Sequence, residues 1–570
     1  MKKTILLFIV ILLFISAEAQ VKSKTYCNPI NLNYRFQPVT GNAASYREAA
    51  DPALMRYKDK YILFVSHSGG YWYSDDMQNW KYLPIKSLPI EEYAPDAITI
   101  NDTTYYAFSN AAKKPLYYTT NPLVDNWKAM DKTLPFAIWD PNFFQDEDGK
   151  VYLYWGCSNT APIYGVRLGA KMQPVTEPAV FIKHNANEYG WEIPGEANEL
   201  SRSGYNEGAW MTRFNSRYYL QYAAPGTEFK TYADGVYTSD SPLGPFKYET
   251  YSPFSFKPSG FIGGAGHSTT FKDKYGNYWH ISSMSISIRH MFERRLGLFP
   301  AAFDKDGVLR VFTAFGDYPT SMPDHKIDFE KESLFKGWMV LSYNKKAEAS
   351  SSLEKFPVKN AFDEDVRTWW SANTGNAGEW LSVQLDDKST INAIQVNFAD
   401  NDSKLKPDSK DIYYCYRILT SNDGKSWNVI VDKSNNKQDA CHDYIELEKP
   451  VKAKYIKLEN VRVPDGKFSV YDLRIFGIKE GNAPAKIYDF TVERNEADTR
   501  KAKVQWNKDN SATGYIVNWG TNPSKLYSSV MVYDASSVNL TALNKDVTYY
   551  YCIDSFNESG ITKGTKILKK

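Results

Sequence analysis

The sequence has few cysteines, almost no net charge and only one long apolar run. The five cysteines of the 570 residues are not spaced like the ligands of a zinc site. A formal net charge of +2 gives no reason to expect nucleic acid or an anionic membrane as a partner. After residue 20 no stretch resembles a membrane segment. With zinc binding, nucleic-acid binding and membrane spanning set aside, the composition points to a globular protein of several domains.

The single apolar run lies at the N-terminus. Lys2 and Lys3 precede ILLFIVILLFIS, and Ala17-Glu18-Ala19 follows as a small-x-small cleavage site. This pattern predicts a signal peptide over residues 1–19, because the run is shorter than the roughly 20 residues of a spanning helix. An uncleaved anchor is the alternative. Cys27 lacks the preceding apolar residue of a lipobox. We therefore expect an exported protein, periplasmic or secreted, with no membrane association after signal removal.

Five is an odd number of cysteines for an exported chain, so at least one stays free or pairs between chains. Cys415 and Cys441 both lie in strand-like segments of one predicted domain. They are the pair that a disulfide would join, and the sequence does not decide between the bridged and the reduced form.

Aromatic residues are abundant, at 15% of the chain with 42 Tyr and 15 Trp, which favours β-structure and surfaces that stack on sugars. One pattern recurs five times: an ionisable residue, a short apolar run, a polar turn, and a second run rich in Tyr, Phe, Val and Ile. Such a unit reads as a β-hairpin. The ionisable residues are Asp51, Asp96, Asp140, Glu207 and His267, spaced 45, 44, 67 and 60 positions apart.

Repeats of this length are typical of β-propeller blades, which take roughly 40–50 residues each plus insertions. The sequence thus predicts an all-β fold, with a five-bladed β-propeller over residues 26–323 followed by two β-sandwich domains. Because equivalent positions of the inner strands surround one channel, three of these carboxylates and His267 are expected to face each other at one end of it.

Facing carboxylates in a sugar-sized pocket suit glycoside hydrolysis, which needs a protonated acid and an ionised partner. Glu207 is the expected acid, since its longer side chain reaches into the pocket and the nearby anion Asp140 would raise its pKa. Asp51 is then the general base. Residues on non-adjacent blades fit the roughly 6.5–9.5 Å separation of an inverting pair better than the shorter separation of a retaining pair.

The order of Asp in blade one, Asp in blade three, Glu207-Gly208 in blade four and Gly264-Ala265-Gly266-His267 in blade five resembles glycoside hydrolase family 43. The resemblance covers residues 26–323 and implies inverting hydrolysis of arabinose- and xylose-containing polysaccharides, with no cofactor required for the chemistry. It implies that Asp51 is the general base, Asp140 the pKa modulator and Glu207 the general acid. His267 matches a histidine that in many members helps to hold a hydrated calcium ion in the channel.

Substrate contacts follow from the same resemblance. Arg294 matches an arginine beside the Asp pair, although its neighbour Arg295 is a close alternative. Asp96 sits in Tyr93-Ala94-Pro95-Asp96, where the family usually has Trp in place of Tyr93, and it either lines the pocket or stabilises a turn. Trp72, Trp139 and Trp210 either stack on a sugar or pack within the blades.

The excursion between blades three and four carries Tyr189, Trp191 and Glu192 and could close one end of the pocket, which favours exo action. Among exo activities we expect α-L-arabinofuranosidase, with β-D-xylosidase as the alternative. A non-catalytic carbohydrate-binding protein is the alternative from another class. It would predict decay of the acid position, whereas Asp51, Asp140 and Glu207 are intact.

Two further domains follow. Residues 333–479 resemble the discoidin or coagulation factor (F5/8) type C family, through Asn360-Ala361-Phe362-Asp363, Trp369-Trp370 and the closing Asp472-Leu473-Arg474-Ile475-Phe476-Gly477. That resemblance implies a glycan-binding β-sandwich, whose binding residues the sequence does not identify. Residues 486–570 resemble fibronectin type III, with Trp506 as a core residue, and are expected to act as a spacer.

Overall fold

The computed structural model describes residues 24–37, 45–90 and 93–570, so the predicted signal peptide lies outside the described residues. Within these ranges the chain is all-β, with two short 3₁₀ helices, η1 (Gly190–Glu192) and η2 (Val358–Ala361), and no α-helix. The described part contains no helix that is long and apolar enough to cross a membrane.

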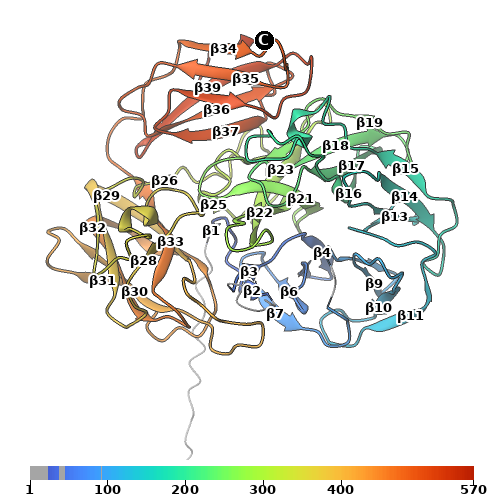
Figure 1. The fold of residues 1–570 in the computed structure, drawn as a ribbon, viewed down its shortest axis with the longest axis horizontal. Coiled ribbons are helices and arrows are strands. Elements are labelled where there is room, and N and C mark those ends of the chain that lie inside the picture. The colour runs from blue at the N-terminus through green and yellow to red at the C-terminus, as the bar shows by residue number, and fades with distance from the viewer. Residues whose placement is uncertain (1–23, 38–44, 91–92) are drawn as a thin grey trace, which may run out of the picture.

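Five small antiparallel sheets follow one another along the first 311 residues, each with its strands in chain order. Figure 1 shows them arranged around a centre, as blades of a propeller. Their bounds are, for blade 1, β4 (Ala53–Tyr57), β5 (Lys60–Phe64), β6 (Gly70–Ser74) and β7 (Lys81–Pro84); for blade 2, β8 (Asp96–Ile100), β9 (Thr103–Ala107), β10 (Pro115–Thr119) and β11 (Lys128–Thr133); for blade 3, β12 (Asn142–Gln145), β13 (Val151–Trp155), β14 (Ile163–Leu168) and β15 (Ala179–Ile182); for blade 4, β16 (Glu207–Phe214), β17 (Arg217–Ala224), β18 (Ala233–Ser239), β19 (Lys247–Tyr248) and, beside β18, β20 (Ser255–Phe256); for blade 5, β21 (Gly263–Lys272), β22 (Tyr278–Ser285), β23 (Arg294–Phe303) and β24 (Leu309–Val311).

The first strands of the blades close a ring. β4 contacts β8, β8 contacts β12, β12 contacts β16, β16 contacts β21, and β21 contacts β4 again. Short strands outside the blades add to the frame: β2 (Arg35–Phe36) pairs with β3 (Arg47–Glu48), and β1 (Thr25–Tyr26) pairs with β25 (Thr320–Ser321). The ring confirms the all-β, five-bladed prediction and places the starts of five equivalent strands around one axis.

Burial within a blade explains the apolar runs of the sequence. The middle strand VYLYW of β13 is buried at every position, because both faces of a blade pack against neighbouring blades. The outermost strand KAMDKT of β11 is largely exposed. Continuous apolar strands and polar outer strands are therefore what this stacking requires.

The second domain is a β-sandwich built on two long strands, β29 (Trp380–Phe398) and β32 (His442–Arg462). Its sheet order is β26-β33-β29-β32-β30-β31, with β27 beside β29 and β28 beside β33. The bounds of the other strands are β26 (Met339–Val340), β27 (Ala347–Ala349), β28 (Trp370–Ser371), β30 (Cys415–Ser421), β31 (Asn428–Asp432) and β33 (Ser469–Ile478).

The third domain has two facing sheets, ordered β34-β35-β38 and β37-β36-β39-β40, with β41 beside β39. Trp506 is buried in its core, as the sequence predicts. The domain does not stand apart as a spacer, because its core is continuous with that of blade 4, and Gly190 N donates to Leu543 O across the contact. Its strands are β34 (Phe490–Arg494), β35 (Ala502–Trp506), β36 (Gly514–Gly520), β37 (Ser528–Tyr533), β38 (Ser537–Leu540), β39 (Tyr550–Asn557), β40 (Gly560–Thr562) and β41 (Leu568–Lys569).

Cys415 and Cys441 form no disulfide, and all five cysteines are free. Cys415 lies on β30, where its thiol donates to Asn436 O. Cys441 packs instead into the core that the second domain shares with blade 1. The two thiols thus lie in different environments and are not bridged.

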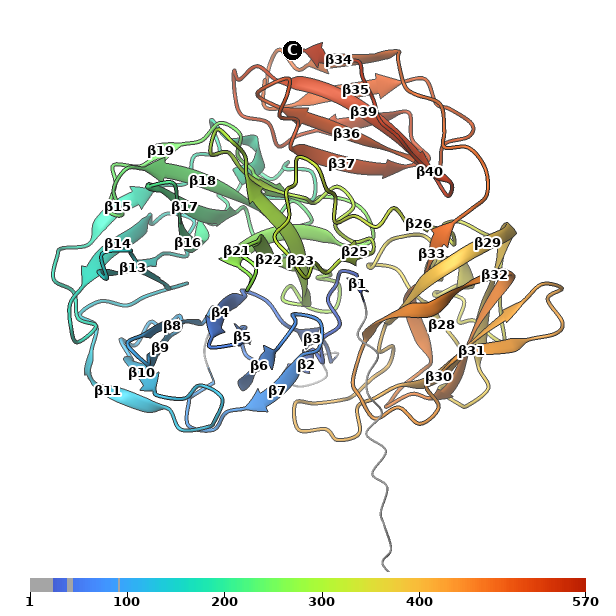
Figure 2. The same ribbon diagram turned by 180° about the vertical axis from the view of Figure 1, so that it is seen from behind.

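A buried ion pair of the second domain lies against the propeller and bonds to it through Arg474. Arg474 donates through Nε and Nη2 to the two carboxylate oxygens of Glu364, at 2.8 Å each, and both side chains are almost fully buried. Its third nitrogen, Nη1, donates to Asp317 O of the propeller. Figure 2 shows β33, which carries Arg474, between the propeller and the rest of the second domain.

Replacing Arg474 with methionine is expected to destabilise the protein by about 3–5 kcal/mol, because Glu364 would stay buried without its cation. Urea unfolding of the full chain, followed by tryptophan fluorescence, measures this. Arg417→Met is the matched control, since the Arg417 pairs with Glu459 and Asp432 are partly exposed and worth about 0–1 kcal/mol. Equal shifts for the two variants would contradict the prediction.

Candidate functional site

One backbone conformation recurs in all five blades, two residues before β4, β8 and β12 and inside β16 and β21. The φ angle is 52° at Asp51, 43° at Ala94, 49° at Asp140, 58° at Gly208 and 50° at His267. This left-handed region is costly for residues other than glycine, and such residues concentrate at functional sites. Here it turns the side chains of three ionisable residues toward the channel end.

A repeated hydrogen bond holds these positions. In each of the five residues with this φ angle, the backbone N–H donates to a side chain of the preceding blade. The bonds are Asp51 to Ser283 Oγ, Ala94 to Ser66 Oγ and Asp140 to Ser109 Oγ, at 2.8 Å each, Gly208 to Asp140 Oδ2 at 3.2 Å and His267 to Asp234 Oδ1 at 2.9 Å. The five positions are therefore structurally equivalent, and they differ from the predicted register in blades 2 and 4.

In blade 2 the equivalent residue is Ala94, and Asp96 lies two positions further along the strand. Asp96 Oδ2 accepts from Phe143 N at 2.6 Å and from Asn142 Nδ2 at 3.2 Å, and the side chain is buried. Asn142, its counterpart in blade 3, likewise accepts from Met211 N of blade 4. Asp96 thus links two blades, and the structure does not bring it together with the other carboxylates.

In blade 4 the equivalent residue is Gly208, and Glu207 directly precedes it. A Cβ at Gly208 would lie 2.8 Å from His267 Cγ, so the position requires glycine. Two side chains hold the Glu207 carboxylate: Tyr232 Oη donates to Oε1 at 2.5 Å, and Cys157 Sγ donates to Oε2 at 3.1 Å. The glycine lets Glu207 reach the channel from a neighbouring position.

His267 lies between the two aspartates. Its Nδ1 is 3.3 Å from Asp51 Oδ1 and 3.8 Å from Asp140 Oδ2. Asp140 in turn approaches Glu207, since the two carboxylates and the Cys157 thiol each offer an atom within 4.8 Å of the others. The structure therefore brings Asp51, His267, Asp140 and Glu207 together at one end of the channel, as the sequence predicts.

The environment shifts the pKa values of Glu207 and Asp51 in opposite directions. Burial raises the pKa of Glu207 to about 7, and the negative charge of Asp140 adds to this effect. Burial alone would also raise the pKa of Asp51, but the charges of Arg294 and His267 outweigh it, so this pKa lies below its ordinary value. At a pH below 7 the site thus holds a protonated Glu207 and an ionised Asp51.

Arg294 is the arginine that serves this site. Its Nη1 donates to Asp51 Oδ1 at 2.8 Å, and its Nε donates to Glu48 Oε1 at 3.0 Å. The next residue of the strand, Arg295, points the opposite way and donates to His442 Nε2 of the second domain at 2.7 Å. The alternation of side chains along β23 decides between the two candidates.

The three predicted tryptophans have different environments. Trp72 is fully buried in the blade 1 core, so its expected contact with a sugar is wrong. Trp210 donates through its indole N–H to Thr270 O of blade 5 at 3.0 Å and packs against the core shared by blades 1 and 2. Trp139, next to Asp140, is half-buried and stays a candidate for substrate contact.

The excursion between blades 3 and 4 does not close the pocket with the predicted side chains. Trp191 and Glu192 are fully buried, and Tyr189 stacks on Tyr248, because this segment docks the third domain onto blade 4. A row of rings stands beside Arg294 instead. Successive ring centroids lie 4.5, 5.6, 5.2 and 4.3 Å apart along Tyr46, His290, Phe292, Tyr93 and His67.

Sequence reasoning missed Tyr232, Cys157 and Glu48. Tyr232 and Cys157 do not occupy the ionisable position of the repeated pattern, and only folding brings them to Glu207. Glu48 lies three residues before Asp51, which was the one available signal. Burial raises the pKa of Glu48 to about 7, although Arg294 opposes the shift.

The channel end also carries side chains of the types that ligate metal ions. Among the described residues, the one group of three with ligand atoms within 4.8 Å is Asp140, Cys157 and Glu207, which excludes His267. A thiol is a poor ligand for calcium, so this group does not fit that ion. His267 Nε2 has no hydrogen-bond partner in the described part of the chain, which fits a water-mediated role.

Comparisons with known proteins match two parts of the chain to family profiles. The profile described as Glycosyl hydrolases family 43 matches residues 41–309, and the profile described as F5/8 type C domain matches residues 346–471. Among curated proteins, the chain is 32% identical over 107 residues to "Beta-D-galactofuranosidase xynD" of Aspergillus niger, covering 19% of this chain and 26% of that protein. It is 25% identical over 268 residues to "Xylan 1,3-beta-xylosidase" of Vibrio sp, covering 41% and 47%.

The matched part therefore spans only about a quarter to a half of those two relatives. Among solved structures, one named "Glycoside hydrolase" aligns with 75% of this chain and 97% of its own, at 18% identity and a TM-score of 0.43.

Proposed function

We propose a function from one premise: through residues 41–309 the chain belongs to family 43 of the glycosyl hydrolases, and residues 346–471 add an F5/8 type C domain. On that premise the protein is an inverting, exo-acting glycoside hydrolase. Its substrates are arabinose- or xylose-containing plant polysaccharides, and its activity is that of an α-L-arabinofuranosidase. The proposal covers the whole protein, including its export.

The observation that carries the proposal is the gathering of Asp51, His267, Asp140 and Glu207 at one end of the channel, where the pKa values of Glu207 and Asp51 shift in opposite directions. Glu207 has a raised pKa of about 7 and can donate a proton to the leaving oxygen, whereas Asp51 has a lowered pKa and stays ionised. Groups pushed apart in this way take the acid and base roles. Asp140 supports the acid by its charge, and His267 bridges Asp140 and Asp51.

In the proposed reaction Asp51 takes a proton from water as the water attacks the anomeric carbon. Glu207 gives its proton to the departing oxygen, and the configuration inverts. Arg294 keeps Asp51 ionised and oriented, and Ser66 Oγ donates to the second oxygen of Asp51 at 2.6 Å. If calcium binds in the channel, as the family resemblance implies, His267 would hold one of its waters through Nε2, and no step of the reaction requires that ion.

The exo mode is supported by the row of rings beside Arg294. Phe292 lies under the Arg294 guanidinium, 4.9 Å from the ring centroid, and Tyr93 packs on Phe292. Bulky side chains at this side of the pocket favour binding of a chain end over an open groove.

β-D-xylosidase is the second candidate, because two curated relatives are named "Xylan 1,3-beta-xylosidase" and "Beta-xylosidase". The two sugars differ in ring form and in one hydroxymethyl group. The intact acid and base positions argue against the non-catalytic alternative.

The test uses the mature protein with the para-nitrophenyl glycosides of α-L-arabinofuranose, β-D-xylose and β-D-galactofuranose, together with arabinan and arabinoxylan. Preferential hydrolysis of the arabinofuranoside supports the proposal, and proton NMR of the first-formed sugar reports inversion. A preference for the xyloside would replace the first candidate with the second. No hydrolysis of any of these substrates would favour the binding-protein alternative.

The pH dependence of kcat/KM should follow the two shifted pKa values. Activity is expected to fall as the pH rises through about 7, where Glu207 loses its proton. Replacing Asp140 with asparagine removes the charge that helps to raise this pKa, so the alkaline limb should move to lower pH. Asp148→Asn, an equal charge change on an exposed turn, should leave the limb in place. An unchanged limb in Asp140→Asn would contradict the role of Asp140.

A further inference from the structure

The F5/8 type C domain carries aromatic and polar side chains on one face of its sheet. In the first half of β29, Trp380 is opposite Glu459, Ser382 is opposite Lys457 and Gln384 is opposite Tyr455 on β32. Because side chains alternate along a strand, these residues share one face. The intervening Leu381, Val383 and Leu385 are buried in the core on the other face.

This face is hollowed. Trp427, just before β31, closes a depression of about 190 Å³ that Trp380, Tyr455, Lys457, Gln384 and Glu348 also line. Two indoles, a phenol and several hydrogen-bonding groups around one hollow are the composition of a sugar site, where rings stack on a sugar face and polar groups bind its hydroxyls.

The hollow lies on the side of the domain away from the propeller. In their other halves, β29 and β32 face the catalytic domain: Gln395 contacts Cys27, His442 accepts from Arg295, and Tyr444 bonds to Thr25. Figure 1 shows β31 and β32 on the far side of this domain from the blades. A ligand here is therefore separate from the catalytic pocket.

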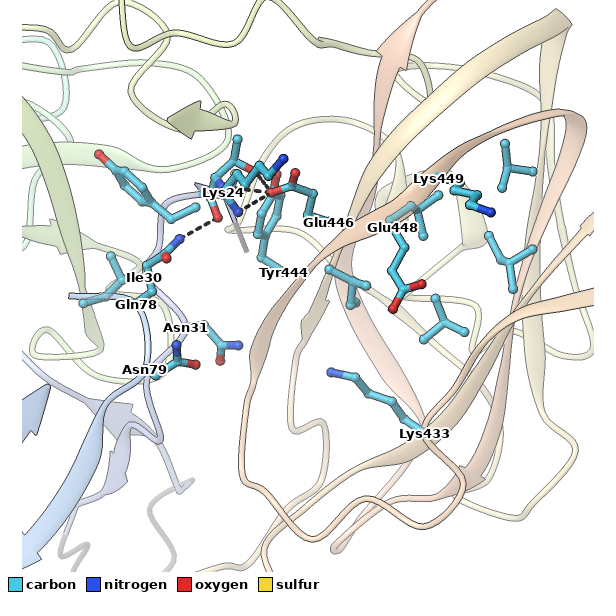
Figure 3. A pocket seen from close by; sticks show the side chains of 18 of the residues that line it. Lys24, Ile30, Asn31, Gln78, Asn79, Lys433, Tyr444, Glu446, Glu448 and Lys449 are labelled. Atoms are coloured by element: carbon cyan, nitrogen blue, oxygen red, sulfur yellow. Dashed lines mark hydrogen bonds between the residues drawn. The ribbon is translucent and has the colours of Figure 1, made fainter. Parts of the chain in front are cut away.

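A different cavity opens at the domain boundary, and we do not assign it the same role. Figure 3 shows its lining of amide, Lys and Glu side chains, including Gln78, Asn79, Glu446 and Glu448. Its ring-bearing residues are Tyr26, which is buried, and Tyr444, which bonds to Thr25. The boundary cavity thus lacks the half-buried indole rings that line the hollow on β29 and β32.

Lys457 gives the hollow its charge preference. Its Nζ lies 4.0 Å from the ring centroid of Trp427 and 5.1 Å from that of Trp380. Among the side chains that the structure describes, no carboxylate lies within 4.0 Å of this ammonium; burial lowers its pKa, and the charge of Glu459, which is paired with Arg417, partly opposes the shift. The neighbouring Lys346 is instead paired with Glu348 at 3.4 Å. An ammonium that lies over two rings and makes no close salt bridge favours a ligand that brings a carboxylate.

We propose that this hollow is a second carbohydrate site, which binds a polysaccharide segment carrying a uronic acid. The rings of Trp427, Trp380 and Tyr455 contact the sugar faces, Lys457 binds the uronate carboxylate, and Gln384 binds hydroxyls. The choice of plant polysaccharide as the ligand class rests on the proposed function. The site would hold the enzyme on its polymer and raise the effective concentration of chain ends. Trp369 and Trp370, which mark the domain in the sequence, serve packing instead.

The test is affinity electrophoresis of the full chain in gels that contain glucuronoxylan, or the same glucuronoxylan with its carboxyl groups reduced to alcohols. Glu207→Gln is the background, so that hydrolysis does not consume the ligand. We expect retardation by glucuronoxylan and much weaker retardation by the reduced polymer. Lys457→Gln and Trp427→Ala should each weaken binding roughly tenfold or more.

Lys503→Gln and Tyr488→Ala, which change an exposed lysine and an exposed aromatic residue of the third domain, are the controls and should bind normally. Thermal midpoints equal to that of the parent exclude misfolding, and Lys457→Gln remains informative if Trp427→Ala does not fold. Equal retardation by both polymers would overturn the uronate assignment. Absence of retardation, or retardation unaffected by both variants, would overturn the site.

Hydrolysis separates this proposal from the proposed function. In the active background, Lys457→Gln should leave the rate on the para-nitrophenyl glycoside unchanged and slow hydrolysis of glucuronate-bearing polymer. A protein that binds glucuronoxylan but hydrolyses nothing would refute the catalytic proposal and leave the site intact.

Discussion

Replacing Glu207 with glutamine is expected to lower the rate of polysaccharide hydrolysis by roughly 10²–10⁴-fold, the usual contribution of a general acid. Glutamine keeps the size of the side chain but cannot supply the proton that the departing sugar oxygen needs. The loss corresponds to roughly 2.7–5.4 kcal/mol of transition-state stabilisation. Initial rates of reducing-sugar release from arabinoxylan measure it.

The size of the loss should depend on the leaving group. Nitrophenolate departs without a proton, so the variant should lose much less activity on the para-nitrophenyl glycoside than on the polymer. The alkaline limb near pH 7 should also disappear, because the group that titrates there is gone. Glu177→Gln, in an exposed loop, is the matched control and should be unaffected. Equal losses on the two substrates would argue that Glu207 is not the proton donor.

Replacing Asp51 with asparagine is expected to lower hydrolysis by a similar 10²–10⁴-fold. Here the loss should be the same for polymer and nitrophenyl glycoside, because attack by water is required whichever group departs. Its pKa lies below the ordinary value, since Arg294 and His267 outweigh burial, so the acid limb of the parent should lie below about pH 4. Rates on both substrates across the pH range measure this.

Folding of the Asp51 variant should be largely preserved. Arg294 keeps its contacts with Glu48 and with Thr227 Oγ1, at 3.0 and 2.9 Å, so no isolated buried cation results. Asp59→Asn, an exposed aspartate in the first turn of the same blade, is the control. Loss on the polymer alone would identify Asp51 as a binding residue and contradict its role as the base.

Local sequence patterns predict much of the fold and several residues of the site. The hairpin repeat predicts five blades because apolar runs and turn residues act within each blade. Asp51 and Asp140 could be found because each directly precedes a proline at the entrance of an inner strand. Asp96 was assigned to the equivalent position of blade 2 because it also lies next to a proline. In that blade, however, the residue before the proline is Ala94, and the aspartate follows the proline. The backbone φ angles and the inter-blade hydrogen bonds, which the sequence does not display, resolve this.

Long-range contacts explain what the sequence missed. Tyr232 and Cys157 reach Glu207 from 25 and 50 residues away, and no periodicity marks them. Trp72 was a candidate for sugar stacking and Trp191 for closing the pocket, but the blade 1 core buries Trp72 and the contact with the third domain buries Trp191. An aromatic residue has the same sequence signature in a core and in a binding site, and only the neighbours distinguish the two.

By itself the sequence determined the all-β class, the fivefold repeat, the type C resemblance and the identity of three carboxylates, because each of these depends on residues close together in the chain. The tertiary structure decided which arginine faces Asp51, which residues tune Glu207, that the third domain packs on the propeller, and that Trp380, Trp427 and Tyr455 share a hollow. These depend on side chains brought together from distant strands. Burial and neighbouring charges, which set the pKa values of Glu207 and Asp51, exist only once the blades have closed.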